Sequence, residues 1–354
     1  MHEKQWSRRR ALTLGGRAAA TVALGSLITG TRAADALAAD ASVARRFDIA
    51  ATSHSLLWNE TIHPGTVMQS FGFDDLRGHL YFVQVLDEVD AGPAGRLRVT
   101  RTNLAGDVLG EMILRDGAGT GWGHGMSVAV ESTPVDVRLW VEVDGAVRED
   151  GLDCTGRALA RIPFVDGATL TPFSAGVEKH RLIRGATDVT CALDPVNNRL
   201  VQRYVVAGTA RYAVYSLDDV VARRYHPVAW FAEPSLARDG RPSTVSSAWP
   251  RPTARPATAA GLIVEIQGHA VYDRHLYILA ANLRDEAHLI AVDLRTGRVV
   301  QRRNLDPGAY PQVLQKAEGM AVQRAGGPAR LCYGFAGGEL GARTTTISYV
   351  ESVI

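Results

Sequence analysis

Cysteine is scarce in this chain: Cys154, Cys191 and Cys332 are the only three among 354 residues. They are far apart and odd in number, which excludes a disulfide-stapled scaffold, although the sequence leaves a single bond such as Cys154 to Cys191 open. Cys-x-x-Cys and His-x-x-x-His pairs are absent, so the common zinc motifs are excluded. The sequence therefore predicts no metal site and no cofactor.

Lysine is as scarce as cysteine, because only Lys4, Lys179 and Lys316 contribute to the 39 basic residues and arginine supplies the rest. The formal net charge is +2, with 46% hydrophobic and 21% charged residues. This balance excludes a disordered chain and indicates a globular one. A net charge this small creates no general field for nucleic acid, which we do not expect as a partner.

Long apolar runs are lacking too, apart from a weakly hydrophobic, Gly/Ala-rich stretch over residues 18–30. It follows Ser7–Leu12, with its three consecutive arginines, and precedes the small-x-small pattern Ala36–Ala38. Residues 1–38 thus resemble a bacterial twin-arginine export signal. The alternative, an amphipathic helix or membrane anchor, is disfavoured because a spanning helix needs about 20 apolar residues.

The predicted signal also determines the sign of the net charge. It holds six basic and two acidic residues, so its removal changes the formal charge from +2 to −2 and leaves 316 residues. No later stretch is apolar enough to cross a membrane as a helix. We therefore expect an exported protein with no membrane contact after signal removal.

Helical periodicity is missing beyond residue 40, and short alternating runs take its place. Five segments share one pattern. Each starts with a polar residue, or with valine in the third segment, continues with a small or flexible position and ends in alternating apolar residues. Their first residues lie 55, 65, 78 and 51 positions apart, a spacing typical of propeller blades. The segments are Gln69–Phe73, His124–Val128, Val189–Leu193, Gln267–Val271 and Glu318–Val322.

Each segment is followed by further strand-like runs joined by Gly-, Asn- and Asp-containing turns, which are typical of hairpins. Five units of about four strands predict an all-β, five-bladed β-propeller, because a closed ring of blades protects the sheet edges. A two-sheet sandwich or an open solenoid is the alternative. The five unequal repeats together are longer than a typical sandwich domain, which disfavours the sandwich.

The last unit ends at Ile354 before a fourth strand is completed. We therefore predict that Arg46–Ala50, within an N-terminal segment over 39–59, closes the ring as that strand. The propeller itself is expected over 60–354. Within it, the proline-rich stretch 233–260 accounts for the 78-residue interval and is expected to be a surface insertion rather than a lid.

In a propeller the innermost strands line a central channel, so their first residues meet at one mouth. The repeat alignment brings polar residues to this mouth at equivalent positions: Gln69, His124, Gln267 and Glu318, with Val189 or Thr190 in the third unit. Loops that lead into the strands add Trp122, Asp188 and Lys316. A ligand site is therefore predicted at this mouth.

The residue types at the mouth favour a carbohydrate ligand. Trp122, in the glycine-rich run 119–125, is expected to stack on a sugar ring. Gln69, His124 and Gln267 are expected to hydrogen-bond hydroxyl groups. Lys316 would offer a positive charge.

An enzymatic alternative uses Glu318 and His124 as acid and base. Hydrolysis of a glycosidic bond needs a second carboxylate about 5–10 Å away. The candidates are Asp188, Glu142 and Asp194, and their spacing selects none of them. Calcium stays open as a ligand of the channel, although the chain has no contiguous acidic loop of the calcium-binding type.

Several motifs, taken in order, resemble a known propeller family. They are His63–Phe71, Gly123–Gly125, Arg138–Asp144, Cys191–Pro195 and Glu318–Ala321. Together they look like the propeller shared by teichoic acid biosynthesis protein C, many exported actinobacterial proteins and the receptor-binding proteins of some phages of Gram-positive bacteria. The resemblance covers about residues 60–354. It implies a five-bladed propeller and, in the phage members, a surface that recognises wall glycopolymers.

The sequence thus predicts a secreted or cell-wall-associated propeller that binds a carbohydrate or cell-wall glycopolymer at one channel mouth. The twin-arginine export machinery is a further expected partner. Two alternatives stay open: a glycan hydrolase or lyase that uses Glu318 and His124, and a scaffold that contacts proteins through its blade edges.

Overall fold

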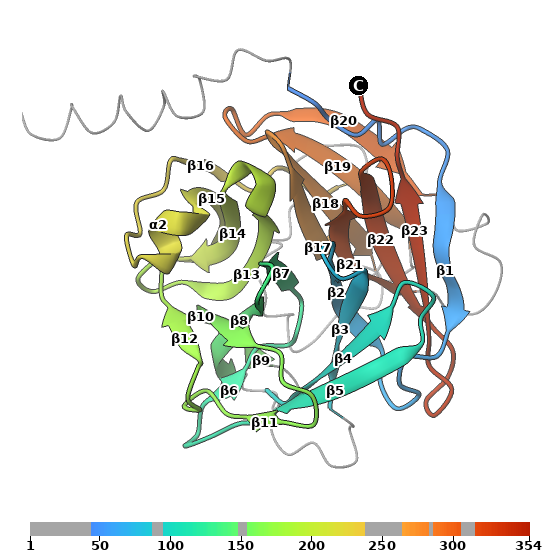
Figure 1. The fold of residues 1–354 in the computed structure, drawn as a ribbon. Helices are drawn as coiled ribbons and strands as arrows, with labels where there is room; N and C mark the ends of the chain where they lie inside the picture. The colour runs from blue at the N-terminus through green and yellow to red at the C-terminus, as the bar shows by residue number, and fades with distance from the viewer. Residues whose placement is uncertain (1–43, 87–94, 148–153, 238–263, 283–285, 306–315) are drawn as a thin grey trace, which may run out of the picture. The chain divides into compact units, whose positions relative to one another are not determined.

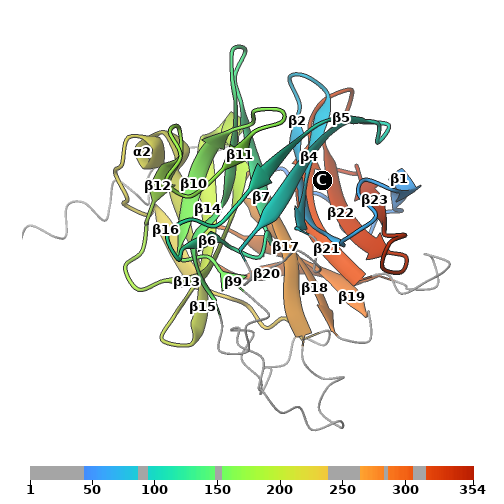
Figure 2. The ribbon, with the colours of Figure 1, turned by 90° about the horizontal axis from the view of Figure 1, so that it is seen from below.

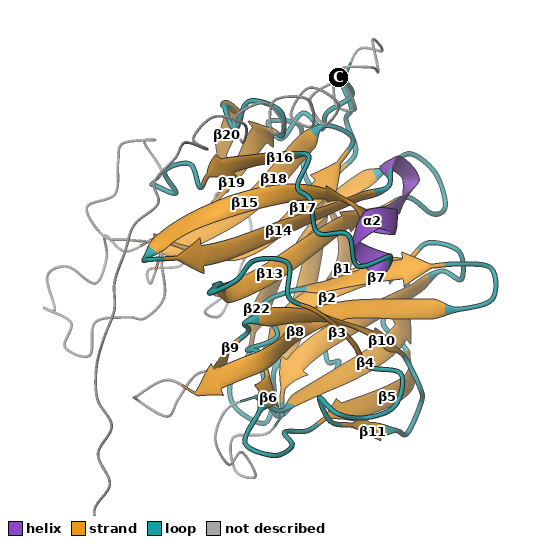
Figure 3. Ribbon diagram, turned by 90° about the vertical axis from the view of Figure 1, so that its left-hand side faces the viewer, coloured by secondary structure: helices purple, strands orange, loops and turns teal. Residues whose placement is uncertain are grey.

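The computed structural model describes residues 44–86, 95–147, 154–237, 264–282, 286–305 and 316–354. Within these residues the chain is almost entirely β-structure (Figure 3). The exceptions are a 3₁₀ turn at Pro195–Asn197 and the short helix α2 (Leu217–Val221). No helix in the described part is long and apolar enough to cross a membrane.

Five mainly antiparallel sheets stand around a common centre as the blades of a five-bladed β-propeller (Figure 1). This confirms the predicted fold class. One strand of each blade faces the centre, and neighbouring inner strands contact one another around the whole ring. The inner strands are β2 (Met68–Asp74), β7 (Val128–Ser132), β13 (Thr187–Asp194), β17 (Val264–Tyr272) and β21 (Lys316–Gln323).

Each inner strand pairs with a second strand and, beyond it, with a third. The second strands are β3 (His79–Val85), β8 (Val137–Val147), β14 (Arg199–Val206), β18 (His275–Asn282) and β22 (Arg330–Gly337). The third strands are β4 (Leu97–Asn103), β10 (Ala158–Pro163), β15 (Thr209–Ser216), β19 (Ala287–Asp293) and β23 (Thr344–Val350).

The outer strands complete the blades. They are β5 (Val108–Leu114), β12 (Glu178–His180), β16 (Ala229–Ala232), β20 (Val299–Asn304) and β1 (His54–Glu60). Three two-residue strands extend the first two blades: β11 (Thr169–Leu170) beside β5, and β6 (Gly121–Trp122) and β9 (Cys154–Thr155) beside β8.

The core lies between the blades. Five apolar clusters of described residues each join two neighbouring blades, because alternate side chains of every strand point to opposite sheet faces. Burial of both faces explains the near-continuous apolar runs of strands such as β18, seven of whose eight residues are buried.

The ring is closed by an N-terminal strand, as predicted, but by a different segment. The fourth strand of the last blade is β1, which pairs antiparallel with β23 at the edge of the ring (Figure 2). The predicted segment Arg46–Ala50 instead packs against the chain end, where Phe47 forms an isolated bridge to Val353. The segment thus pairs with the last residues of the chain, through backbone hydrogen bonds of Arg46 with Ile354 and of Asp48 with Ser352, and not with a strand of the blade. Phe47 and Ile49 are fully buried between the last two blades.

Candidate functional site

A β-bulge lies at the start of four of the five inner strands. The strand pairing shifts by one residue between Met68 and Ser70, Thr187 and Thr190, Ile266 and Gly268, and Ala317 and Met320. A bulge turns a side chain out of the regular alternation and is common beside functional sites. The residues within these bulges include Gln69, Asp188, Gln267 and Glu318.

The bulges correct the repeat alignment in the third blade. Asp188, and not Val189 or Thr190, begins the bulge there, with a left-handed φ of 50°. Val189 is fully buried in the apolar cluster between the second and third blades. The sequence alignment was therefore one residue out of register, since a bulge adds a residue that no local pattern reveals.

Contacts between blades gather the bulges at one mouth of the channel. A Cβ atom at Gly319 would lie 2.9 Å from the Cα of Ser70, so the last blade meets the first closely here. A Cβ at Gly268 would meet the Gly319 backbone at a similar separation. We call the side chains that meet at this end the polar mouth, made up of Gln69, His124, Glu142, Asp188, Gln267 and Glu318.

Glu142 lies beneath the glycine-rich loop of the second blade. Its carboxylate accepts hydrogen bonds from the backbone N–H groups of His124 and Ser127, both at 3.1 Å. Gly123 makes room for it, because a Cβ there would overlap the carboxylate. The side chain is 2% exposed, and burial raises the pKa of Glu142 to about 7.

Glu318 is the second buried carboxyl group of the polar mouth, with an exposure of 1%. Burial raises its pKa, while the charges of Lys316 and His124 act in the opposite direction. Lys316, half exposed at the rim, forms an ion pair with Glu318. His124 also lowers the pKa of Glu142, so one histidine acts on both carboxyl groups.

Trp122 does not belong to the site, contrary to the prediction. Its side chain is fully buried in the cluster between the first and second blades. The indole N–H donates to the carbonyl oxygen of Arg115 at 2.9 Å, as a buried tryptophan requires. The stacking face expected from the sequence is covered by core side chains.

Asp194 is also remote from the polar mouth, because it is the last residue of β13 and Asp188 lies at the start of that strand. Its carboxylate accepts from the guanidinium of Arg324 at 2.7 Å and from the backbone N–H of Asp273 at 2.8 Å. It ties three blades together at the opposite mouth. Of the three acidic candidates, Glu142 and Asp188 therefore lie at the polar mouth and Asp194 does not.

A buried ion pair, which the sequence did not reveal, lies close to Asp188. Arg203 and Glu233 are both 4% exposed and approach to 2.5 Å. The backbone N–H of Glu233 bonds to Ala210, so this residue continues the third blade. Residues 238–260 of the predicted insertion lie outside the described residues.

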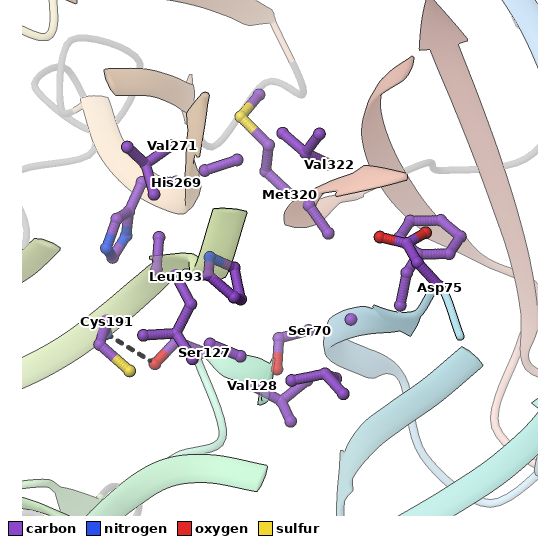
Figure 4. Close-up of a pocket in the computed structure, with 18 of the residues that line it drawn as sticks. Ser70, Asp75, Ser127, Val128, Cys191, Leu193, His269, Val271, Met320 and Val322 are labelled. Carbon is purple, nitrogen blue, oxygen red and sulfur yellow. Dashed lines mark hydrogen bonds between the residues drawn. The ribbon is translucent and has the colours of Figure 1, made fainter. Parts of the chain in front are cut away.

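The channel holds a cavity of about 260 Å³ toward the opposite mouth, and no residue of the polar mouth lines it (Figure 4). Its walls are mostly apolar, with Val128, Val271 and Met320 among them. Its polar lining includes Asp75 and Arg324, the latter bonded to Asp194 at 2.7 Å. Ser127 Oγ accepts from the Cys191 N–H at 3.1 Å, and burial lowers the pKa of His269 to about 3.

Metal ligands and disulfides are not assembled in the described part of the chain. No group of three or more His, Cys, Asp or Glu residues there has the geometry to hold a metal ion. All three cysteines are free and buried. The Cys154–Cys191 bond left open by the sequence is therefore not formed.

Comparison with known proteins gives one sequence relative and a shared fold. No family model matches the chain. It is 26% identical over 186 residues to "Putative major teichoic acid biosynthesis protein C" of Bacillus subtilis (strain 168). The chain resembles the teichoic acid biosynthesis protein C family. This match spans 51% of the chain and 40% of its relative, so the chain corresponds to less than half of that protein.

Solved structures agree on the propeller. The tail fiber of Staphylococcus aureus phage P68 is similar with a TM-score of 0.58 and 15% identity, over 85% of this chain and 53% of the fiber. The GH43_1 enzyme from Xanthomonas citri complexed with xylose gives a TM-score of 0.49 and 14% identity, over 91% of this chain and 96% of the enzyme. At 15% identity the likeness to the tail fiber shows the fold alone.

Proposed function

We propose that this propeller binds a carbohydrate or cell-wall glycopolymer at the polar mouth. The observation that carries the proposal is the repeated bulge, which gathers polar side chains from four blades at one end of the channel. The resemblance to a protein named for teichoic acid biosynthesis supports a wall polymer as the ligand class.

The chemistry of the mouth suits a ligand rich in hydroxyl groups. The amides of Gln69 and Gln267 can both donate and accept hydrogen bonds, as a sugar hydroxyl requires of its partners. Glu318 and Asp188 add acceptors, and Lys316 adds a charged donor at the rim. These side chains are 1–9% exposed apart from Lys316, so Lys316 offers most of the accessible surface among them.

Binding of purified cell walls tests this proposal. We expect Gln267→Ala and His124→Ala to weaken binding about tenfold or more, because each removes a hydrogen bond made away from water. Gln323→Ala is the matched control, since Gln323 is a buried glutamine at the other end of an inner strand. Folded Gln267→Ala and His124→Ala proteins that bind walls as well as the control would contradict the assignment.

A glycan hydrolase or lyase is the second candidate, and the two buried carboxyl groups favour it. Glycosidases use a pair of carboxyl groups, one of them protonated near neutral pH. Glu142, with a pKa of about 7, fits the acid, and Glu318, whose pKa His124 also lowers, is the candidate partner. Release of products from wall polymers, abolished in Glu318→Gln, would support catalysis. Failure to release products from a broad glycan panel would exclude it.

We also propose export through the twin-arginine route. The proposal rests on residues 1–38, which lie outside the described residues, and it is compatible with three buried thiols that need no oxidation. Replacing Arg8, Arg9 and Arg10 by lysine should retain the precursor inside a bacterium that has this route. Secretion of the triple variant at the parental level would refute the proposal.

A further inference from the structure

The cavity toward the opposite mouth of the channel is separate from the polar mouth (Figure 4). The hairpin turns that join each inner strand to the second strand of its blade lie at this opposite mouth. All five turns belong to the described residues: 75–78, 133–136, 195–198, 273–274 and 324–329. The charged groups that these turns bring to the mouth are therefore all known.

The cavity wall is apolar on every side, because each blade contributes to it. Its lining includes Phe73, Val130, Leu193, Val271 and Val322, one from each blade. Protein interiors have few voids larger than a water molecule, and an apolar cavity of about 150 Å³ in another protein holds benzene. With about 260 Å³, this cavity has room for one aromatic ring on a short aliphatic arm, or for a branched aliphatic group of that size.

One carboxyl group in the lining has an oxygen that is available to a ligand. Asp75 Oδ1 accepts from the backbone N–H groups of Arg324 at 2.7 Å and Ala325 at 2.9 Å. These bonds hold the carboxyl group at the edge of the cavity (Figure 4). Oδ2 accepts no hydrogen bond from the described part of the chain. The polar group offered to a ligand is therefore an acceptor.

The basic side chains nearest to Asp75 have other acidic partners. Arg77 pairs with Asp74 at 3.1 Å, and Arg324 pairs with the buried Asp194 at 2.7 Å. Asp75 itself forms no ion pair within the described residues. Burial raises the pKa of Asp75, because its charge is poorly hydrated there. A positive group on a ligand would offset this loss of hydration.

We propose that this cavity binds a small organic amine, whose apolar body fills the channel and whose ammonium group donates to Asp75 Oδ2. Burial of the body and a charge-assisted hydrogen bond supply the affinity. A sugar does not fit, because its hydroxyl groups would be buried against apolar walls without partners. An organic anion does not fit either, because its charge would meet Asp75. The site is independent of the polar mouth and of the function proposed for it.

The methionines provide a local probe of binding. Met126 and Met320 line the cavity, whereas Met68 and Met112 are enclosed in cores between blades. Nuclear magnetic resonance of the protein with methionine methyl groups labelled with carbon-13 therefore reports where a ligand binds. We expect 2-phenylethylamine to shift the signals of Met126 and Met320 and to leave those of Met68 and Met112 in place.

Three probes with a phenyl ring on a short arm separate the body from the head group. They are 2-phenylethylamine, 2-phenylethanol and 3-phenylpropionate, whose heads are positive, neutral and negative. Titration of the methyl signals should give about tenfold tighter binding of the amine than of the alcohol, as expected for a hydrogen bond to a charged group. The propionate should bind most weakly. Equal affinity for the amine and the alcohol would overturn the proposal.

Asp75→Asn removes the proposed partner of the ammonium group. It should weaken binding of the amine about tenfold and leave binding of the alcohol unchanged. Asp107→Asn is the matched control, because Asp107 lies in an exposed turn of the same blade, between β4 and β5, and its loss changes the net charge equally. If both variants bind the amine with the same affinity, no contact with Asp75 exists and the proposal fails.

Ala321→Leu tests whether the body lies in the channel. Ala321 lines the cavity, so a larger side chain there should abolish binding of all three probes. Ala105→Leu, in the same exposed turn as Asp107, should bind like the parent. Tight binding to a folded Ala321→Leu protein would overturn the proposal. So would a shift of the Met68 signal in place of the signals of Met126 and Met320.

Cell-wall binding separates this site from the proposed function. Asp75→Asn should bind walls like the parent, and Gln267→Ala should bind 2-phenylethylamine like the parent. Loss of wall binding in Asp75→Asn would contradict the independence of the two sites. Failure of Gln267→Ala to weaken wall binding would count against the polar mouth and leave the amine site standing.

Discussion

At the scale of single residues, the site depends on burying ionisable groups beside backbone donors. Glu142 receives N–H groups from the loop above it, and Gly123 is needed there because any larger residue would overlap the carboxylate. Burial still dominates and favours the protonated form. With a pKa of about 7, the carboxyl group is partly protonated near neutral pH, so it can either accept a hydrogen bond from a ligand or donate one.

This burial predicts how stability depends on pH. Because the folded pKa of Glu142 is about 7 against an ordinary value of 4.5, the folded state binds more protons between these values. The protonated carboxyl group adds about 3 kcal/mol to the free energy of unfolding below about pH 4.5, and this contribution is lost as pH rises to about 7. Glu142→Gln cannot titrate, so the stability of the parent relative to this variant should fall across that window.

Urea unfolding of both proteins from pH 4 to pH 8 measures the difference. Glu339→Gln, which changes an exposed carboxyl group, is the control and should follow the parent. Parallel profiles for the parent and Glu142→Gln would show that the carboxyl group titrates normally.

At the scale of strands, the bulges convert a repeated sequence pattern into a binding geometry. A regular inner strand would point alternate side chains into the two interblade cores. One extra residue per strand re-aims a polar side chain at the mouth and leaves the rest of the strand in register. The last blade needs a glycine for this, because Gly319 has a φ of +78° and approaches β2 closely.

Two glycine substitutions separate backbone strain from this close approach. Gly319 and Gly326 have φ values of +78° and +80°, but a Cβ at Gly326 meets nothing within 4 Å. Gly326→Ala should cost about 1 kcal/mol of unfolding free energy through its left-handed backbone. Gly319→Ala should cost about 1–3 kcal/mol more, because its Cβ would press on Ser70 and Phe71. Equal losses of unfolding free energy for the two variants, measured by urea unfolding, would mean that the neighbouring strand shifts to accommodate the added methyl group.

At the scale of the whole ring, stability depends on joining the two ends of the chain. The paired residues His54 of β1 and Tyr349 of β23 are 295 positions apart in the sequence, yet the two strands share one blade. This blade must also pack on the first one, and Leu57 belongs to the cluster between them. The closing strand therefore contributes both a sheet edge and part of a core.

Neighbouring residues of β1 test this closure. Leu57 is 4% exposed and Trp58 is 46% exposed, so the two point to opposite faces. Leu57→Ala should lower the unfolding free energy by about 2–4 kcal/mol. Trp58→Ala should cost about 1 kcal/mol or less. Similar losses for both in thermal or urea unfolding would argue against β1 as a core-forming strand.

Much of the ring was predictable because its signals are local. Alternation and turn residues mark strands wherever the chain folds, and their repetition gave five blades and a closing N-terminal segment. The predicted position of the closing strand was wrong, since Phe47 and Ile49 show the same apolar spacing when they fill a core and pair only briefly with the chain end. Trp122 was misplaced for a similar reason, because the flexible glycines beside it indicated an open loop.

The sequence by itself determined the fold class, the blade count and the polar start of the inner strands, since these follow from patterns within a few residues. Only the tertiary structure decided that Asp188 is the polar residue of the third bulge, that Glu142 lies under His124, and that Trp122 is enclosed. Bulges and burial depend on the strand or blade opposite, and that partner lies far away along the chain.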